Sequence, residues 1–292
     1  MNDGASTSCS LAIDHCVLPV ASLAIARERY EALGFTVAPD ARHPFGTGNA
    51  CIFLADGTYL EPLAICETAS YETALAEKNS FILRDYNFRQ ARGDEGFSAL
   101  ALKTEDADAD HERFARSGIS AGSRVEFARP LKGADGSVGE ARFRLAFSAP
   151  ASAGGFCFTC QRLHSSVMGA GALSEHSNAV EGLHSVTVKV KDMPEALGYF
   201  RKLEGRPSAG PEKDTALRFR NCRVRLEQDA ALPADEQMRF DALTFTSTDI
   251  DKLRHILMRS NVVWQDKDGA LHVPPAPGQG ATCIFQENHH EA

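Results

Sequence analysis

The sequence predicts an α+β protein made of four β-α-β-β-β units, paired into two domains that each form a curved sheet. Three observations lead to this prediction. An apolar run typical of a strand is followed by an amphipathic helical pattern at four places in the chain. Each helical pattern ends at Gly or Asn, which adopt the left-handed conformation of a helix C-terminus at low cost. Further β-rich runs then follow each helix.

The four strand–helix starts carry the same signals. The strand-like runs are residues 13–20, 97–104, 183–190 and 242–248, and the helix stops are Gly34, Gly118, Gly205 and Asn261. The residues expected to cap the helix N-termini are Ser22, Asp106, Asp192 and Asp249. Agreement at four starts and four stops indicates an internal repeat.

The β-rich runs after the helices complete each unit. They are residues 35–39, 50–55 and 59–65, then 125–127, 141–147 and 156–163, then 216–220 and 223–228, and finally 262–265, 270–273 and 281–286. Residues 67–95 form a charged, partly helical insertion, and residues 165–181 are typical of a linker. Because a sheet from one unit is too small to bury both faces, we expect two domains, at residues 11–165 and 182–288.

Composition narrows the class of protein. Hydrophobic residues make up 43% of the 292 residues, which is enough for a packed core, and the net charge of −8 disfavours nucleic-acid binding. No apolar run approaches the roughly 18 residues of a membrane span, and residues 1–10 lack the features of a signal peptide. The eight cysteines lie largely in strand-like runs, which favours reduced thiols over a disulfide set. We therefore expect a cytoplasmic protein with a small-molecule partner and neither nucleic acid nor membrane; a homodimer is compatible with this organisation.

Four segments of the first unit resemble the glyoxalase-like domain family: residues 13–20, 33–35, 42–50 and 59–61. This family belongs to the vicinal oxygen chelate superfamily, with glyoxalase I, extradiol dioxygenases and the bleomycin and fosfomycin resistance proteins. The resemblance is specific up to about residue 65 and moderate to about Leu163, and beyond Glu181 it rests on the order of the units alone. It implies paired βαβββ sheets curled around a cavity, often with a divalent metal.

The resemblance assigns metal binding to His15, in the first strand, and Glu61, in the last strand of the same unit. An imidazole and a carboxylate from adjacent strands suit Fe, Mn, Ni, Co or Zn. Strand alternation places Ile13, His15 and Val17 on one face, so we expect His15 and Glu61 to point together into the cavity. The alternatives are a hydrogen-bonded His15 in the pocket wall and an ion pair of Glu61 with a residue such as Arg42.

The second unit departs from the family pattern, in which it supplies another pair of ligands. The stretch that matches His15, residues 97–99, contains no His. The closing strand offers Cys160, Gln161 and His164 but no Glu, which makes Gln161 the candidate third ligand. Cys157 and Cys160 form a C-x-x-C, but residues three apart on a strand point to opposite faces, which argues against a redox pair.

The polar, Gly-rich segment of residues 42–49 lies beside a strand of the first unit. Its candidate substrate-binding residues are Arg42, His43, Thr47 and Asn49. Arg42 and His43 suit a carboxylate or carbonyl group of a ligand. The alternative is a structural turn, with Gly46 and Gly48 at positive φ.

The third unit repeats the pairing with His184 and Glu227, flanked by Arg223 and Arg225. A second two-ligand site and a solvated strand both fit this pattern.

The expected function is a glyoxalase-like, metal-dependent enzyme that acts on a small oxygenated molecule by isomerisation, lyase chemistry or oxygenation. Glu61 would be a ligand and, when displaced, a base. The alternatives are a non-catalytic pocket that sequesters a small molecule, and a binding module with a degenerate C-terminal domain. The missing ligands of the second unit favour sequestration, and the intact pair of His15 and Glu61 favours the enzyme.

Overall fold

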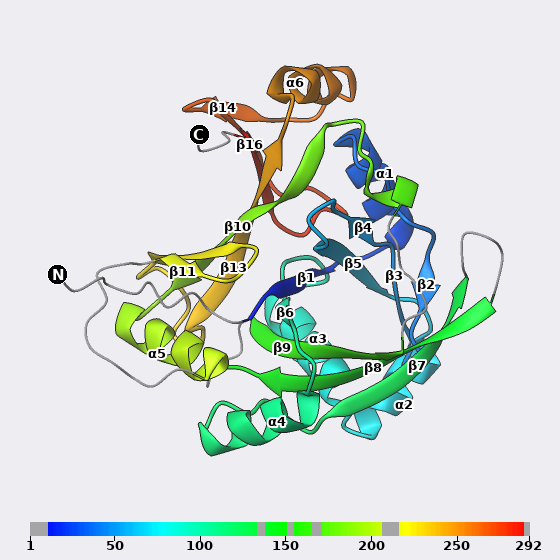
Figure 1. The fold of residues 1–292 in the computed structure, drawn as a ribbon, viewed down its shortest axis with the longest axis vertical. Coiled ribbons are helices and arrows are strands. Elements are labelled where there is room, and N and C mark those ends of the chain that lie inside the picture. The colour runs from blue at the N-terminus through cyan, green and yellow to red at the C-terminus, as the bar shows by residue number, and fades with distance from the viewer. Residues whose placement is uncertain (1–10, 133–137, 151–154, 165–170, 206–215, 289–292) are drawn as a thin grey trace.

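The computed structural model describes residues 11–132, 138–150, 155–164, 171–205 and 216–288, which form two curved sheets (Figure 1). The first sheet comprises β1 (Ile13–Pro19), β2 (Ala41–Arg42), β3 (Thr47–Asn49), β4 (Ile52–Phe53), β5 (Tyr59–Ile65), β6 (Ala99–Lys103), β7 (Val125–Lys132), β8 (Val138–Ser148) and β9 (Phe156–His164). The second comprises β10 (Val180–Val190), β11 (Ala216–Arg218), β12 (Arg223–Gln228), β13 (Met238–Ser247), β14 (Gln265–Lys267), β15 (Ala270–Val273) and β16 (Thr282–Glu287).

The order of the strands confirms the four-unit organisation. The first sheet runs β2-β3-β5-β1-β6-β9-β8-β7, with β4 beside β5, and the second runs β11-β12-β10-β13-β16-β15-β14. In every unit the first strand pairs in parallel with the closing strand, as β1 does with β5 and β13 with β16. Two units meet at an antiparallel pair, β1 with β6 and β10 with β13.

The helices are α1 (Leu23–Ala32), α2 (Thr68–Ala76), α3 (Ser80–Arg92), α4 (Ala107–Arg116), α5 (Met193–Glu204) and α6 (Ile250–Arg259), with a short 3₁₀ turn at Gly171–Ser174. The four predicted stops, Gly34, Gly118, Gly205 and Asn261, all have positive φ, which confirms them as left-handed ends. Asp106, Asp192 and Asp249 accept backbone hydrogen bonds as N-caps, whereas Ser22 makes no side-chain cap bond.

One expected strand is replaced by a neighbouring segment. Residues 35–39 are not in a strand, and the predicted loop of residues 42–49 instead contributes to the hairpin of β2 and β3. Thr47 pairs with Ile65, so that β3 takes the place beside β5. The polar segment is therefore part of the sheet, which fixes the direction of its side chains.

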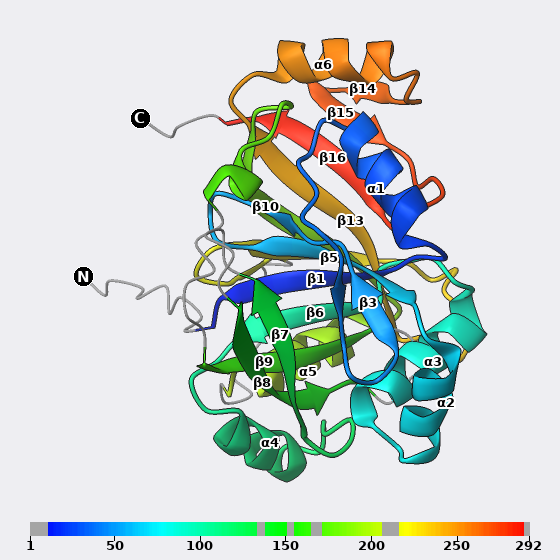
Figure 2. The same ribbon diagram turned by 90° about the vertical axis from the view of Figure 1, so that its right-hand side faces the viewer.

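The two sheets pack against each other through one hydrophobic core. Cys16, Leu18, Leu100 and Leu102 of the first sheet belong to the same cluster as Val186, Val188, Leu243 and Phe245 of the second. Helix α1 lies beside the second sheet (Figure 2). The Tyr30 hydroxyl of this helix donates to the carbonyl of Gln279 at 2.7 Å, which links the two halves. The faces of the sheets that turn away from this shared core are the ones available to a functional site.

The insertion between the first two units forms α2 and α3. Arg89 of α3 pairs with Asp85 and donates to the carbonyl of Leu63 in β5, which fixes the insertion to the first sheet. Phe81 and Ile82 of α3 join the cluster on the sheet face away from the shared core.

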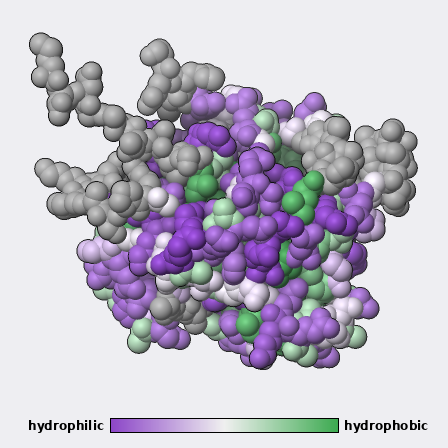
Figure 3. Space-filling model, turned by 60° about the horizontal axis from the view of Figure 1, so that its bottom comes forward, coloured by the Kyte–Doolittle hydropathy of each residue, from purple (hydrophilic) through white to green (hydrophobic). Residues whose placement is uncertain are grey.

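The outer surface is mostly hydrophilic on the side shown in Figure 3, where hydrophobic residues form small separate spots. Such scattered apolar residues are ordinary for a protein surface. Among the helices of the described ranges, none has the length and apolar character needed to cross a membrane.

Candidate functional site

A cavity lies on the face of the first sheet that turns away from the shared core. Its volume of about 40 Å³ has room for a few ordered water molecules or a small chemical group. Six phenylalanines form most of its wall: Phe45, Phe53, Phe81, Phe127, Phe143 and Phe158. The polar lining includes His15, His43, Asn49, Glu61, Arg129 and Arg162. The cavity is thus an aromatic enclosure with polar groups on its floor.

Glu61 lies between two imidazoles on this floor. In the parallel pair of β1 and β5, Val17 is aligned with Glu61, which makes His15 a diagonal neighbour of Glu61. His15 Nε2 is 3.4 Å from Glu61 Oε2, and His43 Nε2 is 3.7 Å from Glu61 Oε1. The Asn49 amide donates to Glu61 Oε1 at 2.5 Å. The structure therefore brings together four of the sequence-predicted site residues, and a fifth, Thr47, contacts His43.

Both imidazoles are held through their Nδ1 atoms. His15 Nδ1 is 2.8 Å from Asp14 Oδ2, and His43 Nδ1 is 2.9 Å from the Thr47 hydroxyl. His15 also stacks on Tyr59, with ring centroids 4.4 Å apart. Because Nδ1 is engaged in each ring, the Nε2 atoms are the ones directed at Glu61.

Asp14 is a site residue that the sequence analysis missed. It is fully buried, and Arg162 approaches its two carboxylate oxygens at 2.8 Å each. Simple alternation would place Asp14 and His15 on opposite faces, but the register of β1 against β6 shifts between Ile13 and His15. Such a bulge redirects side chains. The one available signal was the presence of an acid next to His15 in the sequence.

The same bulge corrects the expectation for Ile13. We predicted that Ile13, His15 and Val17 share one face. Ile13 instead packs in the shared core with Cys16 and Leu18, whereas Val17 packs on the cavity side. The period-2 prediction therefore holds after the bulge and fails before it.

The ionisation states follow from burial and neighbouring charges. Burial alone would lower the pKa of His15, but the hydrogen bonds and charges of Asp14 and Glu61 outweigh it and raise the pKa. Burial would raise the pKa of Glu61, but His15, His43 and Asn49 together lower it to about 2. Burial lowers the pKa of His43 to about 4. At neutral pH the floor therefore holds a carboxylate and a neutral His43, and its neighbours favour the protonated form of His15 more than water would.

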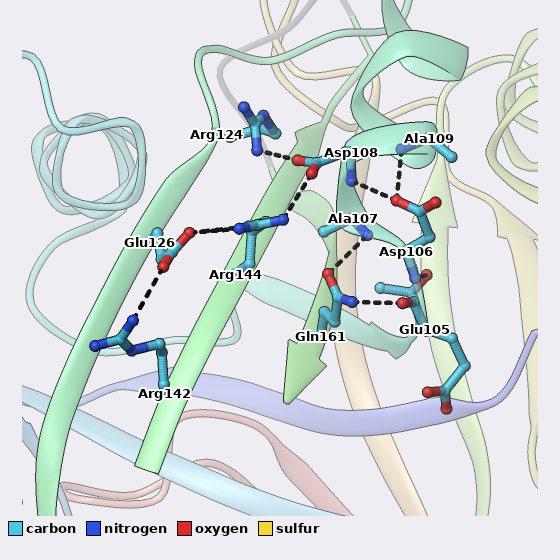
Figure 4. Close-up of polar contacts among 11 residues, drawn as sticks. Glu105, Asp106, Ala107, Asp108, Ala109, Arg124, Glu126, Arg142, Arg144 and Gln161 are labelled. Carbon is cyan, nitrogen blue, oxygen red and sulfur yellow. Dashed lines mark hydrogen bonds and ion pairs between the residues drawn. The ribbon is translucent and has the colours of Figure 1, made fainter. Parts of the chain in front are cut away.

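Two other residues that the sequence predicts for the site, Arg42 and Gln161, do not line the cavity. Arg42 is exposed, and its guanidinium is near Cys66 and Gly48 at the edge of the sheet. Gln161 faces the start of α4, where it accepts a hydrogen bond from the backbone N–H of Ala107 and donates to the carbonyl of Glu105 (Figure 4). Because successive strand residues alternate in direction, Cys160 and Arg162 line the cavity while Gln161 points away.

The second unit supplies an apolar part of the cavity wall. Ala99 and Ala101 of β6 and Phe158 of β9 belong to the cluster on this side of the sheet. His164 lies at the end of β9, and its side chain is outside the described part of the structure. Cys157 packs in the shared core and Cys160 on the cavity side, which confirms that the C-x-x-C residues point to opposite faces.

In the second sheet, His184 and Glu227 lie too far apart to form the second two-ligand site. Glu227 is aligned with Lys189, five residues beyond His184, which corresponds to about 16 Å along the strand. Glu227 instead pairs with Lys189 at 2.5 Å, and both side chains are partly exposed. His184 lies near Arg223 and Arg225, whose charges add to burial in lowering its pKa.

The donor types on the cavity floor suit a divalent metal, because two imidazoles and one carboxylate are a common set for Fe, Mn, Co, Ni and Zn. The engagement of His15 Nδ1 with Asp14 also matches the outer contact that orients metal-binding histidines. Within the described ranges, however, no three His, Cys, Asp or Glu side chains are already grouped as a metal site. The donors therefore fit in chemistry, while the carboxylate is occupied by His15 and Asn49.

Comparison with known proteins gives one family match. Residues 13–203 match the family model described as a glyoxalase-like domain. No curated protein matches the chain.

Solved structures share the fold at low sequence identity. A hypothetical protein from Staphylococcus aureus is 13% identical with a TM-score of 0.66, and the match covers 95% of this chain and 99% of that one. A mutant of 4-hydroxymandelate synthase from Streptomyces coelicolor is 12% identical with a TM-score of 0.58, over 97% of this chain and 94% of that one. At such identities the likeness concerns the fold alone.

Proposed function

Because the chain belongs to the glyoxalase-like domain family, we propose that it is an enzyme that acts on a small oxygenated molecule in the cavity of the first sheet. The observation that carries this proposal is the buried Glu61 carboxylate between His15 and His43, under an aromatic wall. Buried ionisable groups with opposed pKa shifts, gathered in a cavity, are typical of catalytic sites. The reaction is of the isomerase, lyase or dioxygenase type, since this fold serves several chemistries.

In this proposal the pair of His15 and Glu61 moves a proton. The raised pKa of His15 favours its imidazolium form, which can act as the proton donor. Glu61 is a weak base while His15 and Asn49 bond to it, because its pKa is about 2. A substrate oxygen that takes over the His15 hydrogen bond would raise this pKa and activate Glu61 as the proton acceptor.

A divalent metal is the second part of the proposal, and it would take the place of the proton on His15 Nε2, because an imidazole binds a metal only in its deprotonated form. The side chains that would hold it are His15, His43 and Glu61, in place of a set that includes Gln161. Such an ion, when bound, supplies Lewis-acid stabilisation of an oxyanion. Asp14 and Thr47 would orient the two imidazoles through Nδ1.

The second candidate function is a pocket that sequesters a small molecule without catalysis. The observation that favours it is the apolar contribution of the second unit, with Ala99, Ala101 and Phe158 on the two strands from which the family pattern expects ligands. A cavity with one polar side and one apolar side can bind a small molecule without transforming it.

The test is elemental analysis of protein purified without an affinity tag, followed by calorimetric titration of the metal-free protein with Mn, Fe, Ni and Zn. We expect one of these ions to bind the wild type and to raise its melting temperature, since a ligand of the native state alone stabilises it. His15→Ala should abolish binding, and His184→Ala, in the second sheet, should leave it unchanged. Absence of heat and of any melting shift with all four ions would favour sequestration.

A further inference from the structure

Arg129 of β7 is a cation of the cavity wall that the proposed proton transfer does not use. It is half-buried, lines the cavity, and its guanidinium carbon lies 5.7 Å from the centroid of the Phe143 ring. No hydrogen bond or ion pair joins its side chain to any residue of the described ranges. A guanidinium has five N–H donors, so this contact with one ring leaves its donors available.

The other charges of the cavity are already compensated. Arg162 forms its ion pair with Asp14, and Glu61 contacts His15 and Asn49. His43 Nδ1 contacts the Thr47 hydroxyl, and its Nε2 is 3.7 Å from Glu61. Arg129 is therefore the charge in the cavity that lacks a counterion among the described residues.

The surroundings of Arg129 are aromatic. The rings of Phe45 and Phe127 lie 5.1 Å apart, those of Phe127 and Phe143 5.2 Å, and those of Phe45 and Phe81 5.5 Å. A cation that faces such a wall loses part of its hydration, and an anionic ligand can compensate this loss. A carboxylate matches the planar guanidinium best, because it accepts two parallel hydrogen bonds.

We propose that Arg129 binds the carboxylate of the ligand, so that the cavity selects small organic carboxylates whose apolar part lies against the phenylalanine rings. The oxygenated carbon of such a ligand would then face Glu61. This inference rests on the proposed function, because it concerns the same cavity, and it adds the chemical class of the substrate.

The test compares two pairs of small probes that suit the size of the cavity, acetate with acetamide and propionate with propionamide. Within each pair the probes differ in charge and hardly in shape. Calorimetric titration of the full chain should show at least tenfold tighter binding of the carboxylate in one pair or both. Arg129→Gln should abolish this preference, and Arg129→Lys should retain part of it, because an ammonium keeps the charge without the planar donors.

Arg142→Gln is the matched control. Arg142 lies in β8 of the same hairpin, but it contacts Glu126 (Figure 4) and Glu140. This variant loses the same charge and should keep the wild-type preference for carboxylates. Three results would overturn the inference. The wild type could bind carboxylate and amide equally in both pairs, none of the four probes could bind, or the preference could persist in Arg129→Gln.

Glu61→Gln separates this inference from the proposed function. The variant should retain the preference for carboxylates, because Arg129 is intact, while it loses metal binding. A wild type that binds metal but does not distinguish carboxylate from amide would overturn the inference alone. A wild type that distinguishes them without binding any metal would leave the inference standing and favour sequestration.

Discussion

The two sheets share one strand order, but the faces that they turn away from the shared core differ. The first sheet encloses a cavity whose floor holds buried charges, whereas the second presents the partly exposed pair of Lys189 and Glu227 on β10 and β12. The closing hairpins differ in length: β7 and β8 have 8 and 11 residues, and β14 and β15 have 3 and 4. The long hairpin brings Phe127 and Phe143 over the floor.

This difference shows how one scaffold encloses a buried charged pair in one half, while the described residues of the other half leave the corresponding strands with an exposed pair. In the first sheet the insertion of α2 and α3 adds Phe81 to the wall, and water is largely excluded from Glu61. In the low dielectric that results, each charge on the floor requires a partner, and the pKa values shift strongly. The pair on the second sheet lies in water, where it has little effect on either stability or chemistry.

The largest contrast is expected between Glu61→Ala and Glu227→Ala. Glu61→Ala should lower the free energy of unfolding by about 3–5 kcal/mol, because it leaves the buried side chains of His15 and Asn49 without their shared partner. Glu227→Ala should cost less than about 1 kcal/mol, since its pair with Lys189 is partly exposed. Urea denaturation at pH 7 measures both, and similar losses in the two variants would refute the distinction between the sheets.

The acid sensitivity of the first sheet should depend on His43. Its pKa falls from 6.5 to about 4 on burial, so between these values the unfolded chain binds a proton that the folded chain does not. The contribution of His43 to stability should therefore fall by about 3 kcal/mol as the pH decreases from 6.5 to 4, and this contribution should not change further below pH 4. His43→Gln should lose less over this window in denaturation curves at each pH.

The titrations of Glu61 and His15 do not interfere with the comparison of the wild type with His43→Gln. Glu61, with its pKa lowered to about 2, loses its contribution only as the pH falls below its ordinary value of 4.5. His15, with a raised pKa, contributes below pH 6.5 and loses that contribution as the pH rises through its folded pKa. Both are present in wild type and variant. His184→Gln, in the second sheet, should change the acid slope less than His43→Gln, and the reverse order would contradict the assignment.

The smallest effect concerns Gln161, which the sequence analysis considered as a metal ligand. Gln161→Ala should cost about 1 kcal/mol, because the N–H of Ala107 and the carbonyl of Glu105 lose their partner at the start of α4. Metal content and carboxylate binding should stay as in the wild type. Gln286→Ala, in the closing strand of the fourth unit, is the control and should change stability by less than about 0.5 kcal/mol. Loss of metal from Gln161→Ala would restore Gln161 as a ligand.

The sequence by itself determined the repeat and the residues that begin and end its helices. Alternation within β5, the four left-handed helix ends and three of the four N-caps depend on residues close in the chain, so their patterns are readable without the fold. His15 and Glu61 were found because each lies in a strand of one unit, and the parallel pairing of β1 with β5 brings them together.

Only the tertiary structure decided the surroundings of this pair. The bulge in β1 turns Asp14 toward His15, and β9 delivers Arg162 to Asp14 while it directs Gln161 to α4. Arg129 reaches the cavity because the hairpin of β7 and β8 lies over it. Bulges, strand register and sheet curvature follow from packing between segments far apart in sequence, and a one-residue shift exchanges the faces of a strand. Local patterns therefore identify the candidate residues, while non-local packing decides which of them meet.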